Sequence, residues 1–229
     1  MSHIEGLTPG QKFVDYAFGK GALILTPGGR RLDCKRISPY FLDSRLFYTD
    51  ESVDDYLSYT CTSAINVRFG NEVDVVFGPA CLSGAIVMKL LHLTRRNIGC
   101  ANIKDCDGLA NKRVVIVDDI VTDDASLHKA VKTILAKGGN PIGCVIVFDR
   151  QERGYDPVNK VDIPLSPVQS FKQMYKIPII AAAKLSDLVF LLEMVKNKAY
   201  DLGVTTSLNM VRAYRQEYGE IDLIQRGYR

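Results

Sequence analysis

The sequence predicts an α/β fold, a doubly wound and mostly parallel sheet, from two observations. Short β-branched runs without polar alternation are separated by segments whose apolar residues recur at helical spacing. Strands that are apolar on both faces need cover on both faces, which parallel sheets obtain from flanking helices. The 229 residues are 47% hydrophobic and 24% charged, with a net charge of +3. This balance is enough for a buried core and excludes a disordered chain or a coiled coil.

Four apolar runs are expected to be the core strands. A helix over 82–93 follows the first run, and helical spacing over 125–135 follows the second and stops at Gly138-Gly139. Another apolar stripe predicts a helix over 185–195. The expected strands are residues 73–77, 114–117, 144–148 and 177–180.

Helices are also expected near both ends, over 11–19 and 207–217, and polar residues over about 20–45 predict a small N-terminal hood. With a core over about 70–200 and no repeat or low-complexity linker, we expect one domain over 1–229. Charges interrupt the most apolar late stretch, and the start lacks a cationic flank before an apolar run. We therefore expect a cytoplasmic protein without a membrane partner. The short Lys/Arg pairs give no support for a nucleic-acid partner, and Cys and His spacing predicts no protein-ligated metal.

Charged groups follow two of the expected strands, where ligands bind in such sheets. Asp118-Asp119 ends one strand before a turn that opens a helix. Carboxylates there can accept hydrogen bonds from sugar hydroxyls or hold Mg²⁺ through water, and the alternative is an acidic turn in solvent. Residues 149–154, Asp-Arg-Gln-Glu-Arg-Gly, follow another strand, and composition alone favours a solvated charge run there.

The unit of strand, acidic pair, turn and helix resembles the phosphoribosyl pyrophosphate (PRPP) motif of type I phosphoribosyltransferases. Other segments are similar specifically to orotate phosphoribosyltransferase, and they occur in order over nearly the whole chain. These segments are Gln11-Lys12-Phe13-Val14, Ser38-Pro39-Tyr40-Phe41 with Leu46-Phe47, Phe77-Gly78-Pro79-Ala80, Val117-Asp118-Asp119, residues 149–154 and residues 212–219.

The resemblance implies the type I phosphoribosyltransferase fold and transfer of ribose 5-phosphate from PRPP to orotate, in pyrimidine (UMP) biosynthesis. It also implies Mg²⁺ as cofactor and a homodimer in which a mobile basic loop of one subunit closes over the site of the other. The residues carried over by position are Asp118 and Asp119 for the ribose of PRPP, Thr122 and Arg150 for orotate, and Tyr40 and Phe41 for the wall beside the base.

The turn after the acidic pair departs from the family. A Thr-Ala-Gly-Thr-like turn would let backbone N–H groups hold the 5′-phosphate. Here the turn is Thr122-Asp123-Asp124-Ala125-Ser126. A carboxylate at a helix start caps the same N–H groups. Each like-charge pair with a phosphate at ~5 Å and a dielectric of ~20 costs roughly 3 kcal/mol. The sequence therefore predicts a degenerate phosphate loop.

Three further departures affect charges that would hold pyrophosphate. Asp33 takes the place of a hood lysine, and Cys81-Leu82 replaces the Tyr-Lys of the family. The segment between Cys100 and the acidic strand is roughly ten residues shorter than the mobile loop, with Lys104 as the only candidate survivor. Because the leaving group becomes anionic in the transition state, these losses weaken the chemistry that the fold performs elsewhere.

Three functions follow from this sequence. The leading hypothesis is an orotate phosphoribosyltransferase homologue with impaired or absent catalysis, a regulatory or structural paralogue that dimerises with itself or with an active relative. The first alternative is an active enzyme that has rebuilt its phosphate contacts, for example from Lys35, Arg36 and Lys104. The second is a module that binds orotate or a related pyrimidine base without turning it over. PRPP binding is expected to be weakened under the leading hypothesis.

Overall fold

The computed structural model describes residues 6–32, 34–47, 55–79, 99–121, 125–156, 158–198 and 202–221. The chain divides into two compact units. One unit contains residues 1–46, 150–166 and 183–229, and the other contains residues 47–149 and 167–182. We describe each unit separately.

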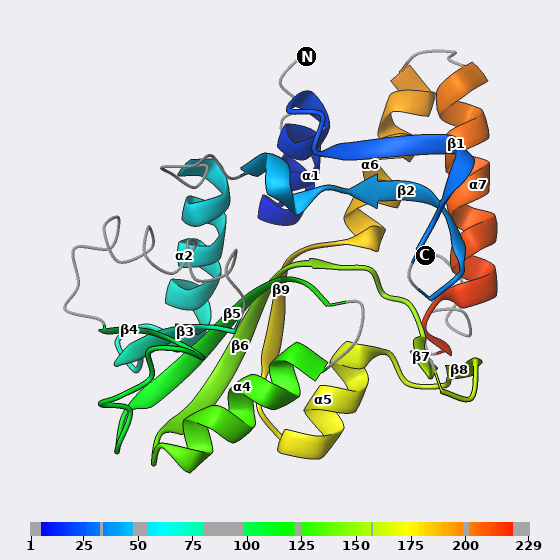
Figure 1. The fold of residues 1–229 in the computed structure, drawn as a ribbon. Coiled ribbons are helices and arrows are strands. Elements are labelled where there is room, and N and C mark those ends of the chain that lie inside the picture. Colours follow the sequence, from blue (N-terminus) through cyan, green and yellow to red (C-terminus); the bar gives the residue numbers. More distant parts are fainter. Residues whose placement is uncertain are drawn as a thin grey trace. The chain divides into compact units, whose positions relative to one another are not determined.

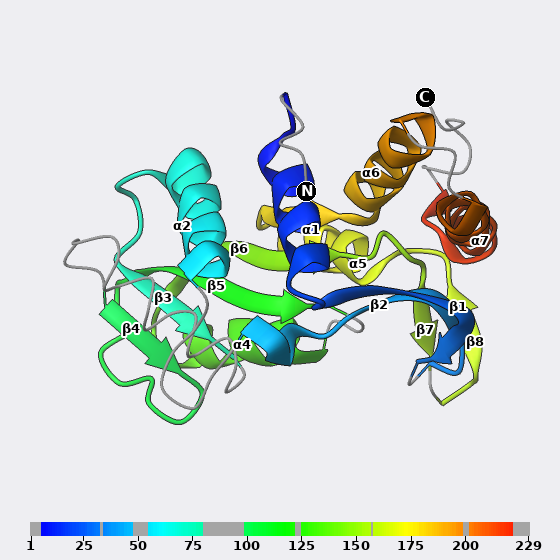
Figure 2. The same ribbon diagram turned by 90° about the horizontal axis from the view of Figure 1, so that it is seen from above.

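The second unit contains the sheet that the sequence predicts (Figure 1). The strand order is β4-β3-β5-β6-β9, and the pairs β4/β3, β3/β5 and β5/β6 are parallel. Figure 2 shows α2 and α4 on opposite faces of this sheet. The elements are α2 Asp55–Phe69, β3 Val75–Gly78, β4 Gly99–Asn102, β5 Arg113–Ile120, α4 Ala125–Ala136, β6 Asn140–Asp149 and α5 Pro167–Tyr175. Two more, η1 Ser44–Phe47 and β9 Ile179–Lys184, each contain residues of both units.

The core of this unit forms because apolar positions on strands and helices meet. Residues 114–117 of β5 are fully buried, as the absence of polar alternation predicts. Four apolar positions of α4 are likewise fully buried, while Leu135, Lys129 and Lys132 are exposed; the buried positions are Leu127, Ala130, Val131 and Ile134. On β6, a Cβ atom at Gly143 would lie 2.0 Å from the ring of Phe69, so only glycine lets α2 approach this strand.

The first unit is built on an antiparallel hairpin. It comprises α1 Pro9–Gly19, β1 Leu23–Arg31, β2 Ile37–Leu42, β7 Gly154–Asp156, β8 Val161–Ile163, α6 Leu185–Lys198 and α7 Leu202–Tyr218. Strand β1 pairs with β2, and the register shifts between Leu25 and Arg30. Helices α1 and α7 pack against the hairpin, and α6 packs against both of these helices. Thr8 and Gln11 form a capping box at the start of α1.

Most expected elements correspond to observed ones. The four predicted strands fall on β3, β5, β6 and β9, although the last strand starts at Ile179 and extends to Lys184. The three helices expected over 11–19, 185–195 and 207–217 are α1, α6 and α7, each longer than predicted. The polar hood contains the β1–β2 hairpin. The helix expected over 82–93 lies outside the described residues.

Candidate functional site

The acidic pair lies at the end of β5, as the sequence predicts. The Asp118 side chain is buried, and its Oδ2 accepts a hydrogen bond of 2.8 Å from Ser126 Oγ at the start of α4. Its Oδ1 accepts from the Asp119 N–H at 3.1 Å. Asp119 is half-buried and accepts from the Ile120 N–H at 2.8 Å. Asp118 is therefore engaged inside the unit, and Asp119 is the more open of the two.

The turn after this pair is described only at its end. Ala125 is exposed and Ser126 half-buried where α4 begins. Thr122, Asp123 and Asp124 lie outside the described residues, so their capping of the helix stays a prediction. The predicted departures at Asp33, Cys81 and Leu82 lie outside the described residues as well.

The connection between β4 and β5, residues 103–112, is short and anchored at both ends. Asn102 Oδ1 accepts hydrogen bonds from the N–H groups of Lys104 at 2.8 Å and Asp105 at 3.0 Å, which closes a tight turn. Cys106 and Leu109 are buried in the hydrophobic core of the unit. Lys104 is exposed on the turn. The connection packs against its own unit rather than extending from it.

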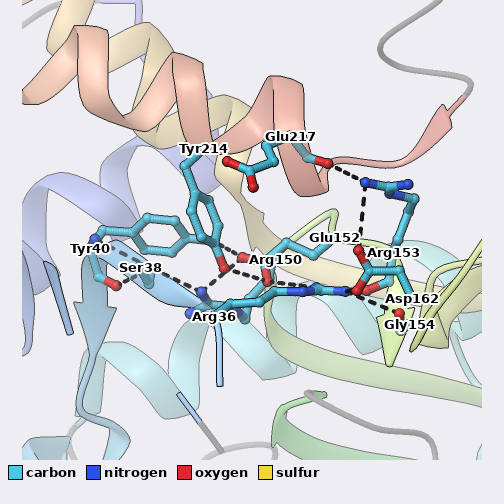
Figure 3. A network of polar contacts seen from close by, with 10 residues as sticks. All are labelled: Arg36, Ser38, Tyr40, Arg150, Glu152, Arg153, Gly154, Asp162, Tyr214 and Glu217. Atoms are coloured by element: carbon cyan, nitrogen blue, oxygen red, sulfur yellow. Dashed lines mark hydrogen bonds and ion pairs between the residues drawn. The ribbon is translucent and has the colours of Figure 1, made fainter. Parts of the chain in front are cut away.

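Arg150 follows β6 and belongs to the other unit (Figure 3). It is buried, and its Nη2 donates to Ser38 Oγ at 3.1 Å and pairs with Glu152 Oε1 at 2.8 Å. Its guanidinium carbon lies 4.5 Å from the ring centre of Tyr40, a cation–π contact. Phe41 is half-buried, and the Arg30 guanidinium lies over its ring at 3.6 Å.

Tyr40 is fully buried inside the first unit. Its hydroxyl donates to Glu152 Oε1 at 2.7 Å, and its ring meets Tyr214 edge-on with centroids 6.1 Å apart. Burial raises the pKa of Tyr40 well above the usual value, and the nearby Glu152 carboxylate raises it further against the opposing effect of Arg150. The phenol therefore stays protonated and acts as a donor.

The segment 149–154 is not the solvated charge run that composition favours. Arg150, Gln151 and Glu152 are each less than 9% exposed. Gln151 adopts a left-handed φ of 52°, and its Oε1 accepts from the Ser186 N–H at 2.8 Å at the start of α6. Sequence composition was misleading here because charged residues are usually exposed unless paired, and Arg150 and Glu152 pair with each other.

Sequence reasoning missed most of the partners of Arg150. Figure 3 shows a polar network around Glu152 and Asp162, whose members come from separate parts of the sequence. Arg36 donates to the carbonyl oxygens of Arg153 and Gly154, 117 and 118 residues away. No local pattern signals such a pairing. A weak signal in the sequence is Arg36, which stands just before the Ser-Pro-Tyr-Phe segment and to which the resemblance assigns no ligand.

The predicted site residues fall into two groups. Asp118, Asp119 and Lys104 lie in the second unit, and Tyr40, Phe41 and Arg150 lie in the first. The structure brings Arg150 onto the ring of Tyr40, whereas the Phe41 ring lies under Arg30, and it places Asp118 beside Asp119. Among the described residues no three His, Cys, Asp or Glu side chains gather where a metal could bind. None of the described helices has the length and apolar character that a membrane crossing requires.

Comparisons with known proteins agree with these features. Residues 94–177 match the phosphoribosyl transferase domain model. Orotate phosphoribosyltransferase from Thiobacillus denitrificans is 30% identical, over 91% of this chain and 97% of that protein. Orotate phosphoribosyltransferase from Chromobacterium violaceum is 31% identical, over 93% of this chain and 98% of that protein.

Solved structures show the same fold. The crystal structure of orotate phosphoribosyltransferase from Francisella tularensis superposes with a TM-score of 0.69, at 24% identity, and covers 91% of this chain and 99% of that chain. Leishmania donovani UMP synthase matches with a TM-score of 0.65 at 16% identity, over 90% of this chain and 42% of that one. The fold is that of the type I phosphoribosyltransferases, and the chain is a member of the orotate phosphoribosyltransferase family.

Proposed function

We propose that this chain is a homologue in pyrimidine nucleotide biosynthesis whose phosphoribosyl transfer is impaired or absent, and that it serves as a regulatory or structural paralogue. The connection between β4 and β5 carries the proposal. The resemblance places the mobile basic loop there, and this chain has residues 103–112, pinned by the Asn102 turn and by buried Cys106 and Leu109. A leaving pyrophosphate needs nearby positive charge, and Lys104 is the cation that remains on that turn.

The acidic pair supports the same proposal. Asp118 is 3% exposed and already accepts a hydrogen bond from the Ser126 hydroxyl. A ribose hydroxyl would have to compete with this internal hydrogen bond, whereas Asp119 is open enough to accept one. We therefore assign weaker ribose binding to Asp118 than the resemblance implies.

Magnesium belongs to the proposal only as a companion of PRPP. Mg²⁺ usually binds through one or two carboxylates together with the phosphates of a substrate. Of the described carboxylates at the end of β5, Asp119 is the one with room to contribute. If PRPP binds, Mg²⁺ would neutralise part of its charge, and Asp119 would be the carboxylate at the end of β5 that contributes to holding the ion.

A coupled assay tests the proposal. The purified chain with orotate, PRPP and Mg²⁺ is expected to make orotidine 5′-monophosphate far more slowly than a typical enzyme. Turnover on the order of 1 per second or more would contradict it. Asp123→Gly combined with Asp124→Gly is expected to tighten PRPP binding in a direct titration, because two carboxylates leave the phosphate position.

A second candidate function, an active orotate phosphoribosyltransferase, is favoured by the similarity over 91% of the chain to proteins that carry that name. Its phosphate contacts would be rebuilt from Lys35, Arg36 and Lys104. Lys35 and Lys104 are exposed, whereas both terminal nitrogens of Arg36 bind carbonyl and carboxylate oxygens within their own unit. On this alternative, Asp123→Gly with Asp124→Gly lowers activity or leaves it unchanged.

We also propose that the first unit keeps base recognition through Arg150, with Tyr40 and Phe41 beside it. The Nε of Arg150 is buried and has no hydrogen-bond partner among the described residues, and the planar, oxygen-rich edge of orotate would supply an acceptor for the guanidinium. Calorimetry with orotate checks this. Base binding without PRPP binding supports a pyrimidine-base sensor, and binding of neither supports a scaffold.

The remaining proposals concern the setting of the protein. We propose a cytoplasmic protein with one phosphoribosyltransferase-like domain over 1–229, its hood over about 20–45 and its core over about 70–200. We propose that it dimerises with itself or with an active paralogue. Light scattering of the chain alone and mixed with that paralogue measures the assembly, and a monomer in both samples would contradict it.

A further inference from the structure

Glu152 is the point at which the polar network of the first unit converges (Figure 3). Its Oε1 accepts from the Tyr40 hydroxyl at 2.7 Å and pairs with Arg150 Nη2 at 2.8 Å. Its Oε2 accepts from the Tyr214 hydroxyl at 3.1 Å and lies 3.5 Å from Arg36 Nη1. The side chain is 8% exposed. Four donors from three parts of the sequence thus fix one buried carboxylate.

The position of Glu152 restricts Arg150 in two ways. The shared Nη2 is held between the Glu152 carboxylate and Ser38 Oγ, which sets the plane of the guanidinium. The Tyr40 ring that donates to Glu152 also lies against that guanidinium. One carboxylate therefore fixes both the arginine and the ring that it packs on.

The second carboxylate of the network, Asp162, differs from Glu152 in its ion-pair partners. Asp162 pairs with Arg36 at 2.5 Å and lies 3.8 Å from Arg153, and it is 31% exposed. Within the described part of the chain, the ion pairs of Asp162 are with Arg36 and Arg153 and not with Arg150, so we expect this acid to stabilise the β7–β8 hairpin rather than the arginine assigned to the base. The two acids share Arg36 as a partner, but only Glu152 pairs with Arg150.

We propose that Glu152 is a positioning residue that holds the Arg150 guanidinium in the orientation required for base recognition. The proposal rests on the assignment of Arg150 to a pyrimidine base under the proposed function. Glu152 does not contact the base itself. It occupies Nη2, and the plane of the guanidinium is therefore fixed before a ligand arrives.

Two measurements on the full chain test this. Nitrogen-15 NMR of the arginine side chains, with the Arg150 signal identified by its loss in Arg150→Lys, reports how fast that guanidinium rotates and exchanges its protons. Orotate titration by calorimetry reports base affinity. We expect Glu152→Gln to speed exchange at Arg150 at least tenfold and to weaken orotate binding at least tenfold. Asp162→Asn, the matched control, is expected to change both less than twofold.

A second variant, Tyr214→Phe, keeps the proposal testable if the Glu152→Gln protein does not fold. Tyr214→Phe removes one donor from Glu152 Oε2, and we expect it to speed Arg150 exchange by about threefold while Asp162→Asn does not. Exchange at Arg150 within twofold of the unmodified chain in Glu152→Gln, or an equal change in Asp162→Asn, would overturn the proposal. If the unmodified chain binds no orotate, base recognition by Arg150 is wrong, and the NMR comparison still decides whether Glu152 holds the guanidinium.

Discussion

Arg36 gives the sharpest test of whether the cations of the hood bind phosphate or hold the protein together. Its side chain is 5% exposed. Nη1 donates to the Arg153 carbonyl at 2.9 Å, and Nη2 donates to the Gly154 carbonyl at 3.1 Å and to Asp162 at 2.5 Å. Arg36→Met keeps most of the apolar stem and removes all of these donors. We therefore expect a loss of stability rather than a loss of ligand binding.

The magnitude follows from the groups left behind. Asp162 is partly exposed and can rehydrate, and Glu152 retains Arg150 and two tyrosine hydroxyls. The two carbonyl oxygens each lose a bond to a charged donor, worth about 1.5–3 kcal/mol. We expect a loss of about 3 kcal/mol in the free energy of unfolding, at the lower end of the range for breaking a buried pair. The melting temperature should fall by roughly 6–12 °C.

Urea unfolding followed by circular dichroism measures this change, provided that the slope of the transition stays constant. Lys35→Met is the control, because it removes the same charge from the adjacent, exposed position. It should change the free energy of unfolding by less than ~0.5 kcal/mol. An Arg36→Met protein as stable as the control, with weaker PRPP binding, would refute the structural role of Arg36 and favour the active enzyme.

Three further predictions concern other parts of the chain. Ser126→Ala deletes the hydroxyl donor to the buried carboxylate at the end of β5 and should cost about 1.5–3 kcal/mol in unfolding free energy. Gly143→Ala places a Cβ atom 2.0 Å from the Phe69 ring and should cost about 1–3 kcal/mol. Arg113 lowers the pKa of Asp74, so this exposed pair stabilises the fold at neutral pH, and that contribution falls progressively as the pH drops from about 4 through the lowered pKa of the carboxyl.

Each of these predictions has a control or a contradicting result. Ser170→Ala on α5 is the size-matched control for Ser126→Ala, and equal losses would contradict a role for the carboxylate contact. Gly19→Ala, where no atom lies within 4 Å of the added Cβ, should be neutral or slightly stabilising. For the ion pair, chemical denaturation of Arg113→Met and the unmodified chain is compared at pH 7 and pH 3. A stability difference that is as large at pH 3 as at pH 7 would show that charge is not its cause.

The strands were predictable because burial on both faces leaves a direct record in the sequence, as in residues 114–117. Helix α2, Asp55–Phe69, was not predicted because its buried face carries Ser58 and Thr60 among the apolar residues. The Thr60 hydroxyl can be buried because it donates a hydrogen bond of 2.7 Å to the Tyr56 carbonyl, four residues earlier in the same helix. Such a helix lacks the apolar stripe on which sequence reasoning depends.

The site was predictable in its members but not in its contacts. The resemblance singled out Arg150 and Tyr40, and the structure brings them into contact. It gave no indication that Glu152 would join them, because one of its donors, Tyr40, is 112 residues away in the chain and Arg36 is still further. Local patterns specify which residues are polar, whereas the choice of buried partners depends on the tertiary fold.

The tight turn at Asn102 also makes this protein a convenient host for engineering. Lys104 and Asp105 are exposed at its tip, while the anchors Cys106 and Leu109 lie beyond it. Doubling a flexible connection of about ten residues costs only ~0.6 kcal/mol in closure entropy. A longer basic segment can therefore be grafted between Lys104 and Asp105 while Cys106 and Leu109 stay in place. The turnover that such a chimera gains would measure how much the length and charge of the β4–β5 connection contribute to phosphoribosyl transfer.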